Sequence, residues 1–104
     1  MLLNGGEIDG QRYLSKETCQ LFTTETSKIS RRGLGFDKPD ADDPKKGNCA
    51  PAAPAEVYGH TGFTGTCAWV DPMNELVYVF LSNRIYPDVT NRNLNQLHIR
   101  ERIQ

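Results

Sequence analysis

The chain has 104 residues, which leaves room for one small domain and not for a multi-domain enzyme. Its 12 Lys and Arg residues nearly balance 13 Asp and Glu residues, so it lacks the basic excess that binding to a nucleic-acid backbone requires. The longest apolar run, residues 76–81, is far shorter than the roughly 20 residues of a membrane-spanning helix, and no signal-peptide pattern follows Met1.

The three cysteines, Cys19, Cys49 and Cys67, are an odd number with no Cys-x-x-Cys spacing and no His at zinc-finger distance. We therefore expect neither a disulfide scaffold nor a structural zinc site. Free cysteine is among the most buried residue types, so Cys19 and Cys67 are predicted to be small core residues, whereas Cys49 is predicted to lie in a loop.

The N-terminal segment contains signals for a helix end, a turn and a new helix. Asn4-Gly5-Gly6 is typical of a helix C-terminus, and a helix that ends there would begin before residue 1, unless the segment is simply a frayed terminus. Asp9-Gly10 predicts a two-residue hairpin turn. Ser15 is a candidate N-cap for a helix of two or three turns, with apolar contacts from Cys19, Leu21 and Phe22.

A short strand and a long loop are predicted next. Residues 33–36, Gly-Leu-Gly-Phe, predict a strand whose glycines allow another backbone to come close. Residues 37–57 hold four of the six prolines and little that could build a core. This segment is predicted to be a loop, and its length is typical either of a functional lid or of a disordered segment.

The second half of the chain predicts an antiparallel hairpin followed by a helix. Residues 63–70 form the first predicted strand, with Phe63, Cys67 and Trp69 on one face. After a turn at residues 71–75, residues 76–81 are apolar on both faces and are predicted to lie inside a sheet that is covered on both sides. A final helix is predicted from Thr90 or Asn91 to Gln104, needing two neighbours because Leu94 and Leu97 lie opposite Ile99 and Ile103.

Residues 59–66 are the candidate chemical segment, because three glycines and three threonines surround His60 there. Glycine admits close approach to the backbone, and Thr hydroxyls with free N–H groups can bind a carboxylate or a developing oxyanion. The alternative is purely structural, with the glycines forming a bulge and His60 capping a turn.

His60-Thr61-Gly62 before a strand, and a second strand that ends in Ser82-Asn83-Arg84, strongly resemble the third motif region of the serine β-lactamase and penicillin-binding-protein superfamily. The form with His is similar to that of the esterase-like and class C-like branches. The resemblance extends over the whole chain in order, from the helix end and turn near residues 1–15, through residues 33–36, to the two strands and the C-terminal helix.

The resemblance implies an α+β fold, an antiparallel sheet of about three strands with a short N-terminal helix and a C-terminal helix. It implies that residues 1–104 are a C-terminal fragment of one domain with a loop at residues 37–57 beside the cleft. His60 would bind an anionic substrate group, Thr61 would hydrogen-bond the substrate, Gly62 would give clearance, and the Phe63 N–H would be an oxyanion donor. No metal and no cofactor is implied.

The chain departs from the family pattern in lacking the nucleophile motif, because no Ser is followed three residues later by Lys. Tyr-x-Asn and Ser-x-Asn, the forms of the second motif, are absent as well. We therefore expect the C-terminal portion of a bacterial serine hydrolase that acts by acyl transfer on an amide, ester or peptide, inactive by itself.

The expected partners are the missing N-terminal half of the domain and a small-molecule or peptide substrate of the parent protein, not nucleic acid, with self-association through surface left uncovered. By resemblance the parent works in the periplasm or cell envelope, and similar domains also occur fused to family-three glycoside hydrolases. The alternative hypothesis is a non-catalytic binding or assembly module that retains the same sheet.

Overall fold

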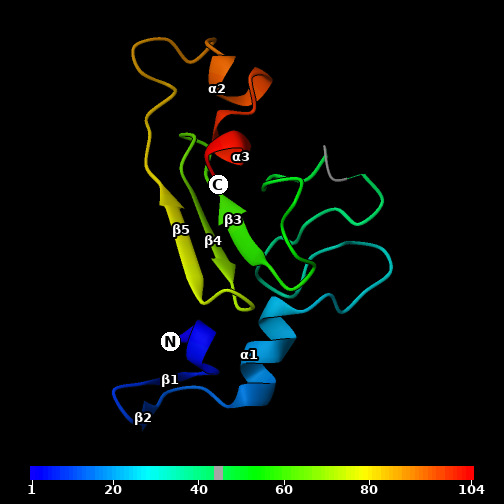
Figure 1. The fold of residues 1–104 in the computed structure, drawn as a ribbon. Coiled ribbons are helices and arrows are strands. Elements are labelled where there is room, and N and C mark those ends of the chain that lie inside the picture. Colours follow the sequence, from blue (N-terminus) through cyan, green and yellow to red (C-terminus); the bar gives the residue numbers. More distant parts are fainter. Residues whose placement is uncertain (44–45) are drawn as a thin grey trace.

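An antiparallel sheet of three strands lies at the centre of the protein, whose computed structural model describes residues 1–43 and 46–104 (Figure 1). The strands are β3 (Tyr58–Thr61), β4 (Cys67–Asp71) and β5 (Leu76–Phe80), in the order β3-β4-β5. Helices at both ends of the chain flank this sheet, so the predicted α+β class is confirmed. Within the described ranges, no helix is long and apolar enough to cross a membrane.

The local signals of the N-terminal segment are confirmed. The 3-10 helix η1 (Leu2–Asn4) ends at Gly5, whose φ of 60° is in the left-handed region. Strands β1 (Glu7–Ile8) and β2 (Gln11–Arg12) form a hairpin through Asp9 and Gly10, which have φ values of 50° and 76°. Positive φ at both central residues is what such a two-residue turn requires.

Helix α1 (Lys16–Thr23) begins where the sequence predicts, because the Ser15 side chain accepts a hydrogen bond from the Thr18 N–H at 3.1 Å. Cys19 is buried as expected, with 4% of its surface exposed. Leu21 and Phe22, which were expected to supply apolar contacts, are 49% and 41% exposed, and the Phe22 ring lies beside Gly35. The helix packs on the rest of the described chain by a narrow stripe around Cys19.

The first strand of the predicted hairpin is wrong in its bounds, because β4 begins at Cys67 and not at residue 63, and the strand predicted at residues 33–36 is not formed. Strand β3 ends at Thr61, and residues 62–66 form a turn in which the Gly62 N–H donates to the Thr66 carbonyl at 2.7 Å. Gly65, at φ 95°, supports this turn, so Phe63 leaves the face that Cys67 and Trp69 share. Residues 33–36 close a turn instead, with the Gly33 N–H donating to the Phe36 carbonyl. The predicted close approach is found at Gly33, which lies against the Phe22 backbone.

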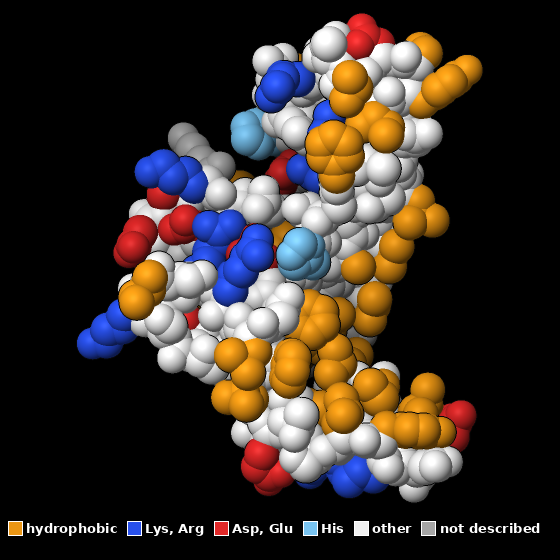
Figure 2. All heavy atoms as spheres, turned by 180° about the vertical axis from the view of Figure 1, so that it is seen from behind, with side chains coloured by type: hydrophobic (Ala, Val, Ile, Leu, Met, Phe, Trp, Pro, Cys, Tyr) orange, Lys and Arg blue, Asp and Glu red, His pale blue; other side chains and the backbone are white. Residues whose placement is uncertain are grey.

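The second strand is at the predicted place, but it is an exposed edge rather than a covered centre. Leu76, Val77 and Val79 of β5 are 50%, 55% and 56% exposed. Viewed from behind, hydrophobic side chains lie uncovered along the side of the molecule where β5 runs (Figure 2). The apolar pattern of residues 76–81 therefore has no cover on one face within the described part of the chain.

The buried core lies between one face of the sheet and the irregular segment before β3. It consists of Cys67 and Trp69 from β4 with Cys49 and Val57 from that segment. The expectation that residues 37–57 contribute nothing to the core is therefore wrong. The described residues of 38–57 form no helix or strand, and Pro44 and Lys45 of the predicted loop lie outside the described residues.

The predicted C-terminal helix is divided into two. Helices α2 (Asn93–Gln96) and α3 (Ile99–Ile103) meet at His98, whose φ of 50° interrupts the helical backbone. The break does not bury both apolar sides, since Leu97 is 54% exposed and Ile103 is 60% exposed. The buried residues of α3 are Arg100 and Glu101. The Tyr78 hydroxyl donates to the Arg100 carbonyl at 3.2 Å and joins α3 to β5.

Candidate active site

Strand β3 brings His60 and Thr61 to one edge of the sheet. It pairs with β4 in a register that places Gly59 opposite Trp69, His60 opposite Ala68 and Thr61 opposite Cys67. A Cβ atom at Gly59 would lie 2.5 Å from the Trp69 ring, so only glycine lets the strand lie directly on this buried indole. The indole therefore fixes the strand immediately before the candidate residues.

His60 is exposed on β3, and its Nδ1 atom lies 2.7 Å from the carbonyl oxygen of Thr61. A carbonyl oxygen can only accept a hydrogen bond, so in a neutral His60 this contact assigns the proton to Nδ1. The Nε2 atom is then the acceptor nitrogen of the ring. Such a side chain can bind an acidic group when protonated or accept a proton when neutral.

Gly62 and Phe63 begin the turn that follows β3. A Cβ atom at Gly62 would collide with the side chain of Thr66, so the turn itself requires glycine at this position. Within the described residues, the Phe63 N–H donates no hydrogen bond, and the residue is 70% exposed. The four predicted site residues, His60, Thr61, Gly62 and Phe63, run from the end of β3 into the turn. The last of them presents a backbone N–H that has no acceptor within the described residues.

The outer edge of β3 is occupied only as far as Gly59. The Asp37 N–H donates to the Gly59 carbonyl at 2.7 Å, and the Gly59 N–H donates back to the Asp37 carbonyl at 3.0 Å. Residues two apart on a strand face the same edge, so Thr61 continues this edge beyond Asp37. The described residues provide no strand partner for Thr61 on that side, which leaves an open edge next to His60.

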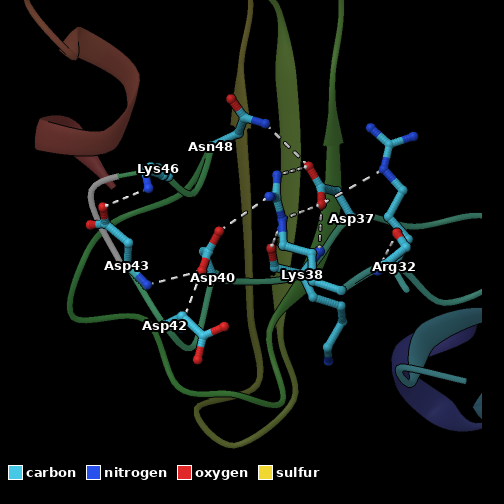
Figure 3. A network of polar contacts seen from close by, with 10 residues as sticks. Arg32, Asp37, Lys38, Asp40, Asp42, Asp43, Lys46 and Asn48 are labelled. Atoms are coloured by element: carbon cyan, nitrogen blue, oxygen red, sulfur yellow. Dashed lines mark hydrogen bonds and ion pairs between the residues drawn. The ribbon is translucent and has the colours of Figure 1, made fainter. Parts of the chain in front are cut away.

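Sequence reasoning missed the polar network that holds Asp37 in this place. Asp37 is 1% exposed, and its carboxylate accepts from Arg31 Nε at 2.8 Å and Arg31 Nη2 at 3.0 Å. Asn48 Nδ2 donates to the same carboxylate at 3.1 Å and the Lys38 N–H donates to it at 3.0 Å. Figure 3 shows Asn48 and Arg32 reaching Asp37 from opposite sides.

The protonation of Asp37 follows from these contacts. Burial acts to raise the pKa of its carboxyl, but hydrogen bonds from Arg31 and Asn48 outweigh burial and hold the pKa below its ordinary value. The carboxylate is thus charged at neutral pH and is bound to Arg31, which precedes the long loop, and to Asn48 within it. The only sequence signal for this ion pair is Arg31-Arg32, since Arg31 stands six residues before Asp37. This signal does not predict that Asp37 lies beside β3.

The chain beyond β5 holds the turn at residues 62–66 from the other side. The Arg84 N–H donates to the Thr64 carbonyl at 2.9 Å, and the Ser82 hydroxyl donates to the same oxygen at 3.3 Å. The guanidinium carbon of Arg84 lies 4.8 Å from the centre of the Phe63 ring, within cation–π range. Ser82-Asn83-Arg84 was expected to end the second strand and instead lies just beyond β5, which ends at Phe80.

A polar hollow with a volume of about 650 Å³ lies apart from His60, and its lining residues include Arg31, Asp37 and Asp40. Among the residues that the structure describes, no group of three or more His, Cys, Asp or Glu side chains could hold a metal ion. The arrangement at His60–Phe63 offers an imidazole, a hydroxyl and a free N–H, which suit an anionic or carbonyl-containing ligand.

Comparisons with known proteins agree on one family. A family model described as "Beta-lactamase" matches residues 1–101. Relatives named "Putative D-alanyl-D-alanine carboxypeptidase" from Escherichia coli O157:H7 and Escherichia coli strain K12 are 33% and 32% identical over 94 residues, which is 90% of this chain and 21% of each relative. A protein of the same name from Salmonella gallinarum (strain 287/91 / NCTC 13346) is 30% identical over 95 residues, 91% of this chain and 22% of that protein. The chain thus spans about a fifth of the length of the curated relatives it matches.

Proposed function

This chain belongs to the beta-lactamase family, and we propose that it supplies one wall of the active site of a serine hydrolase, with β3 and its turn as the third motif. In this proposal His60 binds an anionic substrate group, Thr61 hydrogen-bonds the substrate, Gly62 gives clearance, and the Phe63 N–H stabilises the oxyanion. The observation that carries it is the free Phe63 N–H at the end of an open strand edge beside His60.

The proposed chemistry is acyl transfer through a serine nucleophile. The serine attacks a carbonyl carbon, the negative charge moves to the carbonyl oxygen, and backbone N–H groups that already point at this oxygen stabilise it. Loss of one such donor costs about 100- to 1,000-fold in rate in enzymes of this kind. The bond from the carbonyl carbon to the amine or alcohol then breaks, and this leaving group takes up the proton that the serine gave up. A water later hydrolyses the acyl-serine ester, which releases the acid and restores the serine.

The nucleophile is proposed to come from a part of the natural polypeptide other than these 104 residues. The 104 residues contain no Ser-x-x-Lys, whereas the relatives are about five times as long as the matched segment. The exposed face of β5 supports the same proposal, because Val77 and Val79 leave apolar surface for another part of the domain to cover.

The relatives guide the proposed substrate and location. Their names refer to a D-alanyl-D-alanine carboxypeptidase, and we infer a substrate that is a peptide, amide or ester with a carboxylate near the bond that is cut. We propose the periplasm or cell envelope as the location of this activity, which the names of the relatives support. A second proposal follows from the family resemblance. In it, the domain is fused to a family-three glycoside hydrolase and carries out the same acyl transfer.

Paired histidine substitutions in the complete natural polypeptide test this proposal. His60 and His98 are both exposed, so replacing either by Asn should cost little stability. We expect His60→Asn to lower kcat/KM for ester or peptide hydrolysis by about tenfold or more, and His98→Asn to leave it within about twofold. Thr61→Ala should behave like His60→Asn.

Equal activity of wild type, His60→Asn and Thr61→Ala would refute the assignment of the site. Tight binding of a peptide or sugar without any acyl intermediate would refute hydrolysis itself, and it would favour the non-catalytic binding module. A covalent acyl intermediate, detected by mass, would favour the enzyme.

A further inference from the structure

Lys38 is a buried lysine that has no acidic partner in the described part of the chain. It is 8% exposed, whereas Lys16, Lys28 and Lys46 are exposed. Its Nζ atom donates to the Glu56 carbonyl at 3.1 Å and forms no ion pair with a described residue. Two of the three N–H donors of the ammonium are therefore unused within these residues. A buried charge without a partner is costly.

Both ends of Lys38 are fixed. Its backbone N–H donates to the Asp37 carboxylate at 3.0 Å, and its carbonyl accepts from Arg31 Nε at 3.0 Å. Figure 3 shows the Lys38 side chain running away from this network, and its far end is anchored on the Glu56 carbonyl. The ammonium is thus oriented before any ligand binds, so little side-chain entropy would be lost on binding.

Lys38 lines a hollow at the end of the sheet where β3 begins. The hollow has a volume of about 530 Å³ and lies between η1 and α1 on one side and the start of β3 with the turn after β4 on the other (Figure 1). Leu2, Leu3 and Pro72 give it apolar walls. Tyr58 lines it too, and the buried Tyr58 hydroxyl has no hydrogen-bond partner within the described residues. Apolar walls with a few polar groups are typical of small-molecule sites of this size.

We propose that this hollow binds a monoanionic amphiphile, a molecule with one oxyanion head and a short apolar chain, and that Lys38 binds the head. The inference goes beyond the proposed acyl transfer, because residues 60–63 do not line this hollow. An oxyanion supplies the acceptors and the negative charge that the ammonium of Lys38 lacks. The attraction is stronger here than at an exposed lysine, since less water screens it.

The charges around Lys38 favour one negative charge on the ligand over two. Burial lowers the pKa of the Lys38 ammonium from its ordinary value, and the attraction of Glu56 and Glu25 offsets only part of this effect. Both glutamates also line the hollow, and both are exposed. They would repel a second negative charge, so a singly charged head fits better than a phosphate monoester.

Three octyl compounds test the inference by isothermal titration calorimetry on the complete natural polypeptide, at concentrations too low for micelles. Octanoate carries one negative charge, octanol carries none, and octyl phosphate carries nearly two at about pH 7.5. We expect octanoate to bind about tenfold or more tightly than octanol, since it gains a charge-assisted pair with a buried ammonium. Octyl phosphate should bind more weakly than octanoate.

Lys38→Met tests the residue, because it keeps an unbranched apolar stem and removes a charge that burial already disfavours. Its affinity for octanoate should fall about tenfold, to that for octanol. Lys28→Met is the control, since Lys28 is exposed and does not line this hollow. It should bind octanoate within about twofold of wild type. In the wild type, octanoate should slow acetylation of Lys38 and not of Lys28, as read by peptide mass mapping.

Octanoate binding no tighter than octanol binding, or tighter binding of octyl phosphate, would overturn the inference. Equal affinity of wild type and Lys38→Met for octanoate would overturn it as well, and so would an equal loss in Lys38→Met and Lys28→Met, because net charge would then explain the effect. If Lys38→Met does not fold, an unchanged acetylation rate of Lys38 in wild type with octanoate overturns it. None of these measurements uses hydrolysis, so the proposed function is tested separately by its acyl intermediate.

Discussion

Replacing Asp37 by Asn should destabilise the protein because it removes a buried charge and keeps the shape of the side chain. Arg31 Nε and Nη2 then lose their charged acceptor, and Arg31 keeps the 3.0 Å hydrogen bond from Nε to the Lys38 carbonyl and the longer 3.4 Å contact to Asp40. Asn also turns one acceptor oxygen into a donor that faces the donors of Arg31 or Asn48. The Asp37 side chain is 2% exposed, so water cannot replace the lost partner.

The expected loss of free energy of unfolding is about 3 kcal/mol. Breaking a fully buried ion pair costs about 3 to 5 kcal/mol. The Arg31 side chain is 30% exposed and can recover some hydration, which places this pair at the lower end of that range. Asp40→Asn is the control, since Asp40 contacts the same guanidinium from a more exposed position and makes no backbone pair with β3. Its effect should be a small fraction of that of Asp37→Asn.

Urea unfolding at neutral pH measures this difference, provided that the slopes of the transitions agree. The pKa of Asp37 is lower in the folded protein, so the stability that the charge contributes is present above the unfolded-state pKa of about 4 and is lost as pH falls through the folded-state pKa. The gap between wild type and Asp37→Asn should therefore close below about pH 4. Equal effects of Asp37→Asn and Asp40→Asn, or a gap that persists at low pH, would refute this reasoning.

Three further outcomes follow from the packing. Gly59→Ala should lower the free energy of unfolding by about 1 to 3 kcal/mol in urea, because its Cβ would meet the Trp69 ring, and an unchanged midpoint would contradict the observed packing. Burial raises the pKa of the Cys49 thiol to about 11, so its alkylation by iodoacetamide at pH 8 should be much slower in the folded chain than in urea, and equal rates would contradict its burial. Val79→Lys should weaken self-association of the isolated chain in sedimentation experiments, since Val79 is 56% exposed on the edge strand β5, and an unchanged mass distribution would exclude this edge as the contact.

Local signals of the sequence are reliable where one residue decides the backbone. Gly5 ends η1, Asp9-Gly10 closes the first hairpin, and Ser15 caps α1 as predicted. In each case the deciding interaction lies within a few residues, so no distant contact can overrule it.

The sequence predictions are wrong where contacts between residues far apart in the sequence determine the backbone conformation. Residues 33–36 have the pattern of a strand, but the sheet partner of that region is the single residue Asp37, which a buried carboxylate network holds against Gly59. The strand predicted at residues 63–70 begins only at Cys67, because residues 62–66 form a turn that Ser82 and Arg84 hold from beyond β5, and periodicity cannot reveal these contacts. The C-terminal helix breaks at His98, where the positive φ interrupts the backbone, and Leu97 and Ile103 stay more than half exposed on the two sides of the break.

The candidate site was predictable as a motif and not as a geometry. His60-Thr61-Gly62 is recognisable in the sequence, and the structure places these residues with a free Phe63 N–H at the end of β3. The contacts that hold this segment come from Asp37 on one side and Arg84 on the other. Both are separated from His60 by more than 20 residues, and their roles depend on side-chain packing that only the fold provides.

Intact mass after exposure to a serine-reactive fluorophosphonate tests the central claim most directly. The complete natural polypeptide should gain one adduct, and peptide mapping should place it on a serine outside residues 1–104. The isolated chain should gain none, because its four serines, Ser15, Ser27, Ser30 and Ser82, lack a following Lys at the motif spacing. An adduct on one of these four serines, or no adduct on the complete polypeptide, would contradict the account.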